Sequence, residues 1–361
     1  FPAFPHSYEP SSAARTVRMG YNKAFAWIVG KLLEEDDRSV YFGEDIANKN
    51  GGVLALTKGV YDRFGPARVF NTPISEEAMV AIAAGRALAG GNPICEFEFS
   101  PFFLEAARVF AHVVAPNWYS KKLSYGFTAI FPCGIVHGGS SGHFHEAWPE
   151  RFLVPMGGIV VVAPSSAHDV VGFMRTAHEF RGPVAMLLQI SAASLHDFYS
   201  EVPEDPYAIP FGKARIVCEG KDVTVITYGA ACVAAAKNEA EKLAKDGISL
   251  EVIDLRTVYP WDAETIRASI RKTGRCVILH EDYYKEGFGQ VLKGELMEDE
   301  FLEHIKTRHI KVLGASTPFI PTDPDLVWNR LPYELERSAD GGMRHRSQKL
   351  AAFARDSMKY R

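Results

Sequence analysis

The chain has 361 residues, of which 47% are hydrophobic and 23% charged, an ordinary composition for a folded protein with room for two domains. The formal net charge of −4 gives no electrostatic reason to expect nucleic acid, whose binders usually carry a basic patch. No run of about 18 apolar residues occurs, so the sequence predicts no membrane-spanning helix. The five cysteines are dispersed without a CxxC pair, which indicates buried thiols in a reducing compartment and excludes a disulfide framework or zinc site.

Over the first two hundred residues, apolar positions at helical spacing alternate with short apolar runs that are typical of buried strands. The predicted helices span 22–33, 74–90, 103–115 and 167–180, and the predicted strands span 39–45, 92–99, 158–166 and 183–190. This alternation favours an α/β fold with a mainly parallel sheet that helices cover on both faces. Residues 15–200 are therefore predicted to form a first domain, preceded by an irregular leader at residues 1–14.

Residues 201–212 contain three prolines and no periodicity, and they are predicted to link two domains. The alternation starts again over residues 213–345. There the predicted strands span 222–229, 248–255 and 275–282, and the predicted helices span 230–247 and 262–274, each ending in glycine. This order predicts a βαβαβ domain with right-handed crossovers. Residues 346–361 are a basic tail that could form one surface helix.

The glycine-rich stretch GGSSGHFHEAWPE, residues 138–150, holds two histidines one residue apart, His143 and His145. With Glu150 and Gly157 they follow the pattern H-x-H-x4-E-x6-G, which is close to the first metal-binding motif of cupins. Cupins are all-β jelly rolls, however, and this chain alternates strands with helices. A cupin-like metal protein therefore stays a distant alternative, and an exposed loop with incidental histidines is a further one. We expect no metal ligands in this chain.

Several longer stretches resemble the β subunit of thiamin-diphosphate-dependent 2-oxo acid dehydrogenases, the E1β family. Residues 40–90, which include VFNTPISEEAMVAIAAGRALAG, come first, and EVPEDPYAIPFGKA, IDLRTVYPWD, HED, GFG and STPF follow in the family's order. The resemblance implies a pyrimidine-type thiamin-diphosphate-binding domain followed by a transketolase C-terminal-like domain. VFNTPISE and IDLRTVYPWD favour the branched-chain type, although NPICEF is closer to the pyruvate type.

The resemblance also implies an activity, which is the oxidative decarboxylation of a small 2-oxo acid with acyl transfer to a lipoyl domain. In this family the cofactor lies between two subunits, and the α subunit holds its diphosphate and Mg²⁺ through a GDG…N motif that this chain lacks. The expected partners are an E1 α subunit, in an α2β2 heterotetramer, and a lipoyl acyltransferase E2 core, with no nucleic acid or membrane. The expected location is the mitochondrial matrix, or the cytoplasm if the chain is bacterial.

Two catalytic residues follow from the same resemblance. Glu76 falls on the family's glutamate, whose carboxyl group acts at N1′ of the cofactor's pyrimidine ring. His145 falls on the histidine that faces the 2-oxo acid and the lipoyl group, and imidazole suits that role because its ordinary pKa lies near working pH. The residues alone leave another interpretation open, because the helix macrodipole favours acids such as Glu76 and Glu77 in a first turn. Glu77 keeps that structural interpretation.

Three residues are expected to contact the cofactor in addition to Glu76. Phe102 falls on the family's aromatic residue that packs on the pyrimidine ring, and Ile74 falls on an aliphatic contact. Glu98 stands where the family has a glutamine. Core packing remains an alternative interpretation for Phe102.

The chain departs from the family around this expected site. The changed positions carry Glu98, Arg108, Val109, His112, Ile130, Val154, Pro155 and residues 189–191, and Phe180 and Gly182 occupy the family's potassium-site positions, so we do not predict bound potassium. Replacing one partner of a buried hydrogen bond leaves the other partner unsatisfied, which costs stability. So many replacements together therefore indicate that the hydrogen-bond network of the site has been rebuilt. Two hypotheses follow: an active E1β that retains Glu76 and His145, and a catalytically degenerate E1β-like subunit with a structural role in assembly.

Overall fold

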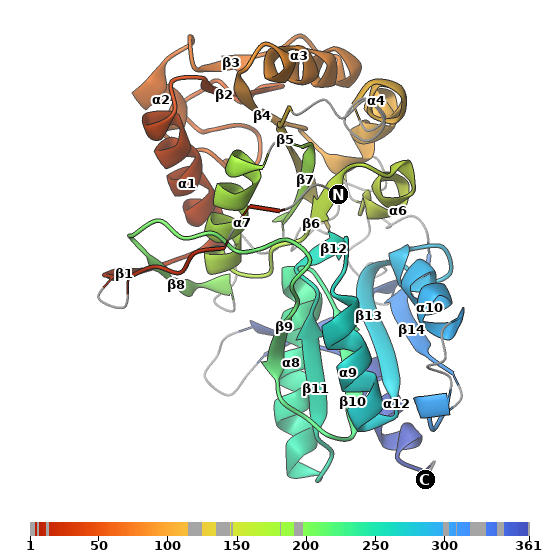
Figure 1. The fold of residues 1–361 in the computed structure, drawn as a ribbon. Coiled ribbons are helices and arrows are strands. Elements are labelled where there is room, and N and C mark those ends of the chain that lie inside the picture. The colour runs from red at the N-terminus through yellow and green to blue at the C-terminus, as the bar shows by residue number, and fades with distance from the viewer. Residues whose placement is uncertain are drawn as a thin grey trace.

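Two α/β domains make up the computed structural model, and Figure 1 shows them one above the other, with the C-terminus at the far end of the second. The structure describes residues 4–5, 7–11, 14–114, 125–134, 145, 147–180, 182–190, 198–298, 303–307, 309–317, 330–337 and 343–359. Within these residues, no helix combines the length and the apolar composition that crossing a membrane requires.

The first domain is built on a seven-stranded sheet. In spatial order its strands are β12 (Thr257–Tyr259), β6 (Val160–Val162), β7 (Val184–Gln189), β5 (Thr128–Cys133), β4 (Asn92–Glu96), β2 (Ser39–Gly43) and β3 (Val69–Asn71). All neighbours are parallel except β12, which runs antiparallel to β6. The strands from β6 to β2 are buried along their whole length, as expected for parallel strands with both faces covered. The predicted parallel α/β sheet is confirmed.

Helices pack on this sheet in two pairs. The first pair is α1 (Tyr21–Glu35) and α7 (Ala167–Glu179), the second pair is α3 (Glu76–Leu88) and α4 (Phe103–Val109), and the short helix α2 (Val60–Phe64) contacts α1. α1 lies against α7, and α3 lies against α4, on either side of the strands in Figure 1. The helix predicted for residues 103–115 is α-helical only as far as Val109 and continues as a π-helical segment over Phe110–Val114.

The second domain contains the predicted βαβαβ unit. Its five-stranded sheet has the order β14 (Lys311–Ala315), β13 (Cys276–Tyr283), β10 (Val223–Thr227), β11 (Leu250–Asp254) and β9 (Arg215–Cys218), and its helices include α8 (Ala230–Lys245), α9 (Ala263–Thr273) and α10 (Phe288–Glu298). The neighbours are parallel except β9, which is antiparallel to β11. Gly274 ends α9 with a left-handed φ of 71°, as the glycine at that position predicted.

The structure adds detail to two sequence-based expectations at the domain boundaries. β8 (Ser200–Pro203) pairs with β1 (Thr16–Met19), so the first residues of the predicted linker form a strand whose partner lies far away in the sequence. The basic tail contains the expected helix, α12 (Gln348–Ser357), which exposes one side and packs its apolar side against α8 in the second domain's core. The basic tail therefore belongs to that domain, next to a hairpin formed by β15 (Glu334–Arg337) and β16 (Met343–Arg346).

The irregular leader is anchored on the first domain by aromatic contacts. The ring of Phe4 lies 5.8 Å from that of Phe180 and 5.6 Å from that of Phe211, measured between centroids. Tyr8 donates a hydrogen bond from its hydroxyl to Glu179, at 2.8 Å, and forms an isolated β-bridge with Ala208. Leader and linker thus pack together on the end of α7.

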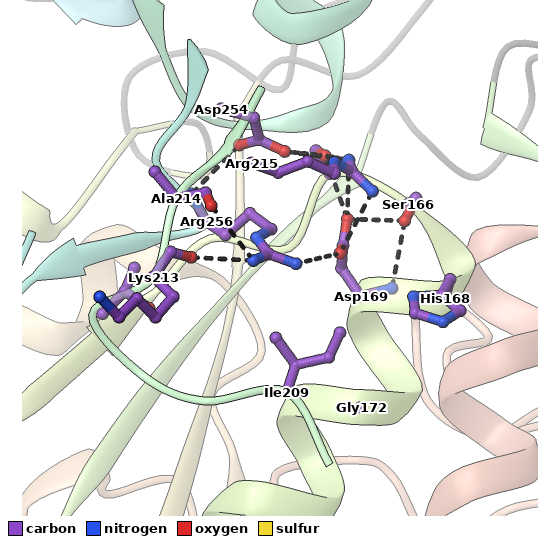
Figure 2. Close-up of polar contacts among 12 residues, drawn as sticks. Ser166, His168, Asp169, Gly172, Ile209, Lys213, Ala214, Arg215, Asp254 and Arg256 are labelled. Carbon is purple, nitrogen blue, oxygen red and sulfur yellow. Dashed lines mark hydrogen bonds and ion pairs between the residues drawn. The ribbon is translucent and has the colours of Figure 1, made fainter. Parts of the chain in front are cut away.

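A buried charge network joins the two domains (Figure 2). Nη2 of Arg215 lies 3.1 Å from a carboxylate oxygen of Asp169 in α7 and 3.1 Å from one of Asp254 at the end of β11. Both aspartate side chains are 0% exposed. Arg256 adds a second cation 3.5 Å from Asp169, and its left-handed φ of 55° accompanies a backbone hydrogen bond to the Asp254 side chain. Burial raises the pKa of Asp254, whereas at Asp169 the two arginines outweigh burial and lower the pKa. These residues, here called the Arg215 network, fix the domains relative to each other.

Candidate active site

The candidate site lies where two neighbouring parallel strands end. β2 and β4 are adjacent, and the chain leaves them toward Glu44 and Glu98. α3 begins at Glu76, close enough for its charge to act on both of those carboxyl groups. Ligand sites of open parallel sheets lie outside the carboxyl ends of the strands, and the three glutamates meet at this edge.

Glu76 is held by the first turn of α3 and is only 9% exposed. Ser75 caps the helix, since its side chain accepts a hydrogen bond from the backbone N–H of Ala78. The backbone N–H of Ser75 donates in turn to Oε1 of Glu44, at 2.9 Å. The next residue, Asp45, has a φ of 51°, a left-handed conformation that is costly for a residue other than glycine and that persists where the surroundings enforce it. Glu44 and Asp45 therefore belong to a tightly constrained turn beside Glu76.

The charges of this cluster interact with one another. Burial raises the pKa of Glu44, and the neighbouring Glu76 and Glu98 raise it further. Burial also raises the pKa of Glu98, with Asp45 and Glu76 adding to the effect and His145 opposing it. Acids whose pKa values are raised by burial and by neighbouring charges are typical of functional sites, which makes this cluster a candidate.

His145 lies between two phenylalanine rings at the same edge. Its ring centroid is 4.6 Å from that of Phe99, with the planes 86° apart, and 5.7 Å from that of Phe102, with the planes 67° apart. Such edge-to-face contacts fix an aromatic ring in orientation as well as in position. The imidazole is partly exposed and lies within electrostatic range of Glu98.

The residues predicted from the resemblance thus come together in space. Glu76, Glu98, Phe102 and His145 surround one partly buried edge, and Ile74, two residues before Glu76, is 89% exposed beside it. The side chain of Ile74 is therefore accessible at this edge. Glu77 is directed elsewhere and pairs with Arg108 on the surface of α3 and α4, in agreement with its structural interpretation.

The metal-binding alternative is not supported by the fold, because a cupin site needs a jelly roll and this chain is α/β. Across the described ranges, no group of three or more histidine, cysteine, aspartate or glutamate side chains is arranged to hold a metal ion. His143 lies outside the described residues.

Two further positions that depart from the family make contacts within the core and between the domains. Ile130 of β5 is fully buried and pairs in register with Glu96 of β4, whose carboxyl group accepts a hydrogen bond from Tyr41. Gln189, at the end of β7, accepts a hydrogen bond from the backbone N–H of Ala231 at 2.9 Å and donates one to Glu281 at 2.5 Å. Both partners of Gln189 belong to the second domain. The altered position therefore contributes to the domain interface.

Sequence reasoning missed Glu44, Asp45 and Phe99. Glu44 and Asp45 were included in a predicted strand, although β2 ends at Gly43 and the rule for strand ends would have singled out the acids that follow. Phe99 was included at the end of the predicted strand 92–99, although β4 ends at Glu96, and only the structure shows that its ring contacts His145. No local pattern links two residues so distant in sequence.

Comparison with known proteins decides the family. Family models described as the transketolase pyrimidine binding domain and the transketolase C-terminal domain match residues 17–193 and 212–329. The mitochondrial 2-oxoisovalerate dehydrogenase subunit beta of Dictyostelium discoideum is 36% identical over 330 residues, which cover 88% of this chain and 86% of that protein. The chain belongs to the E1β family of 2-oxo acid dehydrogenases.

Further relatives fall on both branches of the E1β family. The 2-oxoisovalerate dehydrogenase subunit beta of Bacillus subtilis is 34% identical, with 85% of this chain and 93% of that protein covered. The pyruvate dehydrogenase E1 component subunit beta of Staphylococcus aureus is 36% identical, with coverages of 82% and 90%. A solved structure described as a split-gene transketolase, inactive beta4 tetramer, superposes with a TM-score of 0.74 at 19% identity over 95% of this chain and 99% of that chain, which supports the fold.

The residues at the candidate site fit the pyrimidine half of thiamin diphosphate, the cofactor of this E1β family. An aminopyrimidine ring needs a carboxyl partner at one ring nitrogen and apolar surface on its faces. Glu76 supplies a largely buried carboxyl group, and Phe102 and Ile74 supply an aromatic and an aliphatic surface beside it. The neighbouring acids offer oxygen atoms that can accept hydrogen bonds from the ring's amino group.

Proposed function

We propose that this E1β chain forms the pyrimidine side of a thiamin-diphosphate site and, with an α partner, catalyses oxidative decarboxylation of a branched-chain 2-oxo acid with acyl transfer to a lipoyl domain. The observation that carries this proposal is the convergence of Glu76, Glu98, Phe102 and His145 at one edge of the first sheet. Relatives from two distant organisms are 2-oxoisovalerate dehydrogenase subunits, which favours the branched-chain type.

Each residue has a distinct part in the proposed reaction. When bound, thiamin diphosphate supplies the carbon nucleophile and the electron sink that decarboxylation of a 2-oxo acid requires. Glu76 holds a proton at N1′ of the pyrimidine ring, and Glu98 lies beside it as a second contact. Phe102 and Ile74 pack on the ring and are covered by it. His145 moves a proton at the carbonyl oxygen of the substrate, in surroundings from which the phenylalanine rings exclude water.

The proposed site needs a second chain to be complete. This chain offers carboxyl groups and apolar surface, but its sequence has no GDG…N motif for a metal-bound diphosphate. We therefore propose an E1 α subunit that holds the diphosphate and Mg²⁺, in an α2β2 heterotetramer that delivers acyl groups to a lipoyl acyltransferase E2 core. Mitochondrial relatives favour the mitochondrial matrix as its location, and the bacterial relatives favour the cytoplasm for a bacterial chain.

The test compares two neighbouring glutamates in the assembled E1. Glu76→Gln keeps the shape of the side chain and removes its acid, so kcat for 3-methyl-2-oxobutanoate is expected to fall by about 10²- to 10⁴-fold. Glu77→Gln, one residue further along α3 and paired with Arg108 on the surface, is the matched control and should leave kcat within a small factor. Pyruvate serves as the competing substrate.

The outcome separates the two hypotheses for this chain. An assembled complex that binds thiamin diphosphate and turns over the branched substrate in preference to pyruvate agrees with the proposal. Equal activity of Glu76→Gln and wild type would refute the role of Glu76. A stable complex with an α partner that takes up no cofactor and turns over no 2-oxo acid would instead establish the assembly role.

A further inference from the structure

Hydrogen bonds hold the backbone two residues after His145 against the residues that follow strands β4 and β5 of the first domain. The backbone carbonyl of Ala147 accepts a hydrogen bond from the hydroxyl of Ser100 at 2.6 Å and another from the backbone N–H of Gly134 at 3.3 Å. Ser100 begins a short 3₁₀ turn, Ser100–Phe102, whose last ring contacts His145. The same turn therefore holds both the imidazole and the backbone two residues beyond it.

The next residue, Trp148, is fastened to the second domain. Its side chain is 2% exposed and meets the ring of Tyr228 edge-on, with 5.7 Å between centroids. Its six-membered ring lies against Gly229, where an added Cβ would come within 2.6 Å of Cη2. Gly229 also has a left-handed φ of 77°, so the loop after β10 takes this shape and leaves room for the indole.

Two polar contacts across the domain interface follow at the start of α6 (Glu150–Leu153). Oε1 of Glu150 accepts a hydrogen bond of 2.7 Å from the hydroxyl of Tyr228, and both residues are almost completely buried. Arg151 pairs with Asp282 at the end of β13, at 3.7 Å. Burial raises the pKa of Glu150 well above its ordinary value, and the charge of Asp282 adds to this effect. A glutamine at this position keeps the shape of the side chain and an oxygen that can accept the hydrogen bond from Tyr228.

We infer that Glu150 is a positioning residue through which the second domain sets the place of His145 in the candidate site. Tyr228 holds Glu150, and Trp148 packs on the same tyrosine, so the backbone between them and Ala147 has little freedom. His145 lies two residues before that fastened segment. Its orientation against Phe99 and Phe102 thus depends on a hydrogen bond that the other domain donates. A displacement of about 1 Å at a catalytic group can cost about 100-fold in rate.

The variants follow from these contacts. Tyr228→Phe removes only the hydroxyl that holds Glu150, and Glu150→Ala removes the acceptor. Glu150→Gln keeps an acceptor for Tyr228 and serves as the conservative rescue. Tyr21→Phe is the matched control, because the Tyr21 hydroxyl is equally buried and donates at 2.9 Å to the carbonyl of Pro164, away from this segment.

The kinetic readout rests on the proposed function and uses the assembled E1. Tyr228→Phe and Glu150→Ala are expected to lower kcat by about 10- to 100-fold while leaving the Kd for thiamin diphosphate unchanged, because His145 moves and Glu76 does not. Glu150→Gln should recover most of the lost kcat. Tyr21→Phe should keep the wild-type kcat.

A second readout needs no turnover and therefore separates this inference from the proposed function. The rate at which diethyl pyrocarbonate modifies His145 is measured by mass spectrometry on the full chain, relative to the exposed His304. Release of the imidazole from its two phenylalanine neighbours should raise this rate several-fold in Tyr228→Phe and leave it unchanged in Tyr21→Phe. If Tyr228→Phe matches Tyr21→Phe in this rate, the inference is wrong, whether or not the wild type turns over a 2-oxo acid.

Discussion

Replacement of Arg215 by methionine tests whether the Arg215 network holds the domains together. The arginine contacts Asp169 and Asp254 at 3.1 Å, and both carboxylates are 0% exposed. Removing one partner of a buried ion pair leaves an uncompensated charge and costs about 3–5 kcal/mol. The Arg215 side chain is 35% exposed, so water can reach part of the vacated space, and Arg256 still lies 3.5 Å from Asp169. We therefore expect the lower end, a loss of about 3 kcal/mol.

The assay is urea unfolding followed by the fluorescence of the five tryptophans, with the midpoint compared at constant slope. Arg15→Met is the matched control, because Arg15 makes a 3.9 Å ion pair with Glu204 in which the side chains are 82% and 46% exposed. An exposed pair of this kind contributes about 1 kcal/mol or less. Arg215→Lys keeps the charge without the planar fork and should fall between wild type and Arg215→Met.

The pH dependence of the loss gives a second check. Because the two arginines lower the pKa of Asp169 below 3.8, its stabilising effect is present above that pH and is lost as pH falls through the folded-state value. The difference between wild type and Arg215→Met should therefore narrow below about pH 4. If Arg215→Met loses no more free energy of unfolding than Arg15→Met, the reasoning is refuted, because the buried carboxylates would then not be stabilised by Arg215.

Three further predictions concern buried groups elsewhere in the first domain. Burial lowers the pKa of His178 to about 4, so stability that is present above pH 6.5 is lost as the pH falls toward 4. His178→Gln cannot take up this proton and should lose about 3 kcal/mol less over that range. A variant whose Tm depends on pH as steeply as that of wild type would contradict this. Burial raises the pKa of Glu96 well above its ordinary value, so stability that is present at low pH is lost as the pH rises through the folded-state pKa. Glu96→Gln can still accept the hydrogen bond from Tyr41. Its Tm should equal that of wild type at pH 5 and exceed it at pH 9. Gly43→Ala would place a Cβ 2.3 Å from the backbone carbonyl oxygen of Glu96 and should lower the free energy of unfolding in urea by about 1–3 kcal/mol. The Cβ of Gly85→Ala in α3 meets nothing within 4 Å, and this variant should gain about 0.5–1 kcal/mol. Equal effects of the two substitutions would disprove the steric argument.

The parts of the fold that were predictable are those with a local signal. α9 illustrates this, because Asp262 caps its start, Gly274 ends it, and apolar residues recur at helical spacing between them. A helix was expected in the basic tail, but the packing of α12 on α8 was missed, because an amphipathic pattern does not say which surface its apolar side covers. β8 was missed because a four-residue strand that ends in proline depends on its partner β1 for its existence.

The candidate site divides in the same way. Glu76, Glu98, Phe102 and His145 were all predicted from the resemblance, because each falls on a functional position of the E1β family. The phenylalanine pair around His145 and the role of Glu44 depend on strand ends meeting at one sheet edge. Contacts of that kind are set by sheet order, which no local pattern encodes.

The antiparallel strand β12 gives the second domain a part in the solubility of the first. β12 is the last strand of the seven-stranded sheet to be synthesised, and it pairs with β6 at the sheet's edge. Until the ribosome has made residues 257–259, the backbone amides and carbonyls along that side of β6 have no strand to pair with, and such an open edge is a template for association with other chains. A fragment that ends within the linker would keep this edge permanently. Synthesis of the second domain therefore supplies the strand that covers this edge of the first.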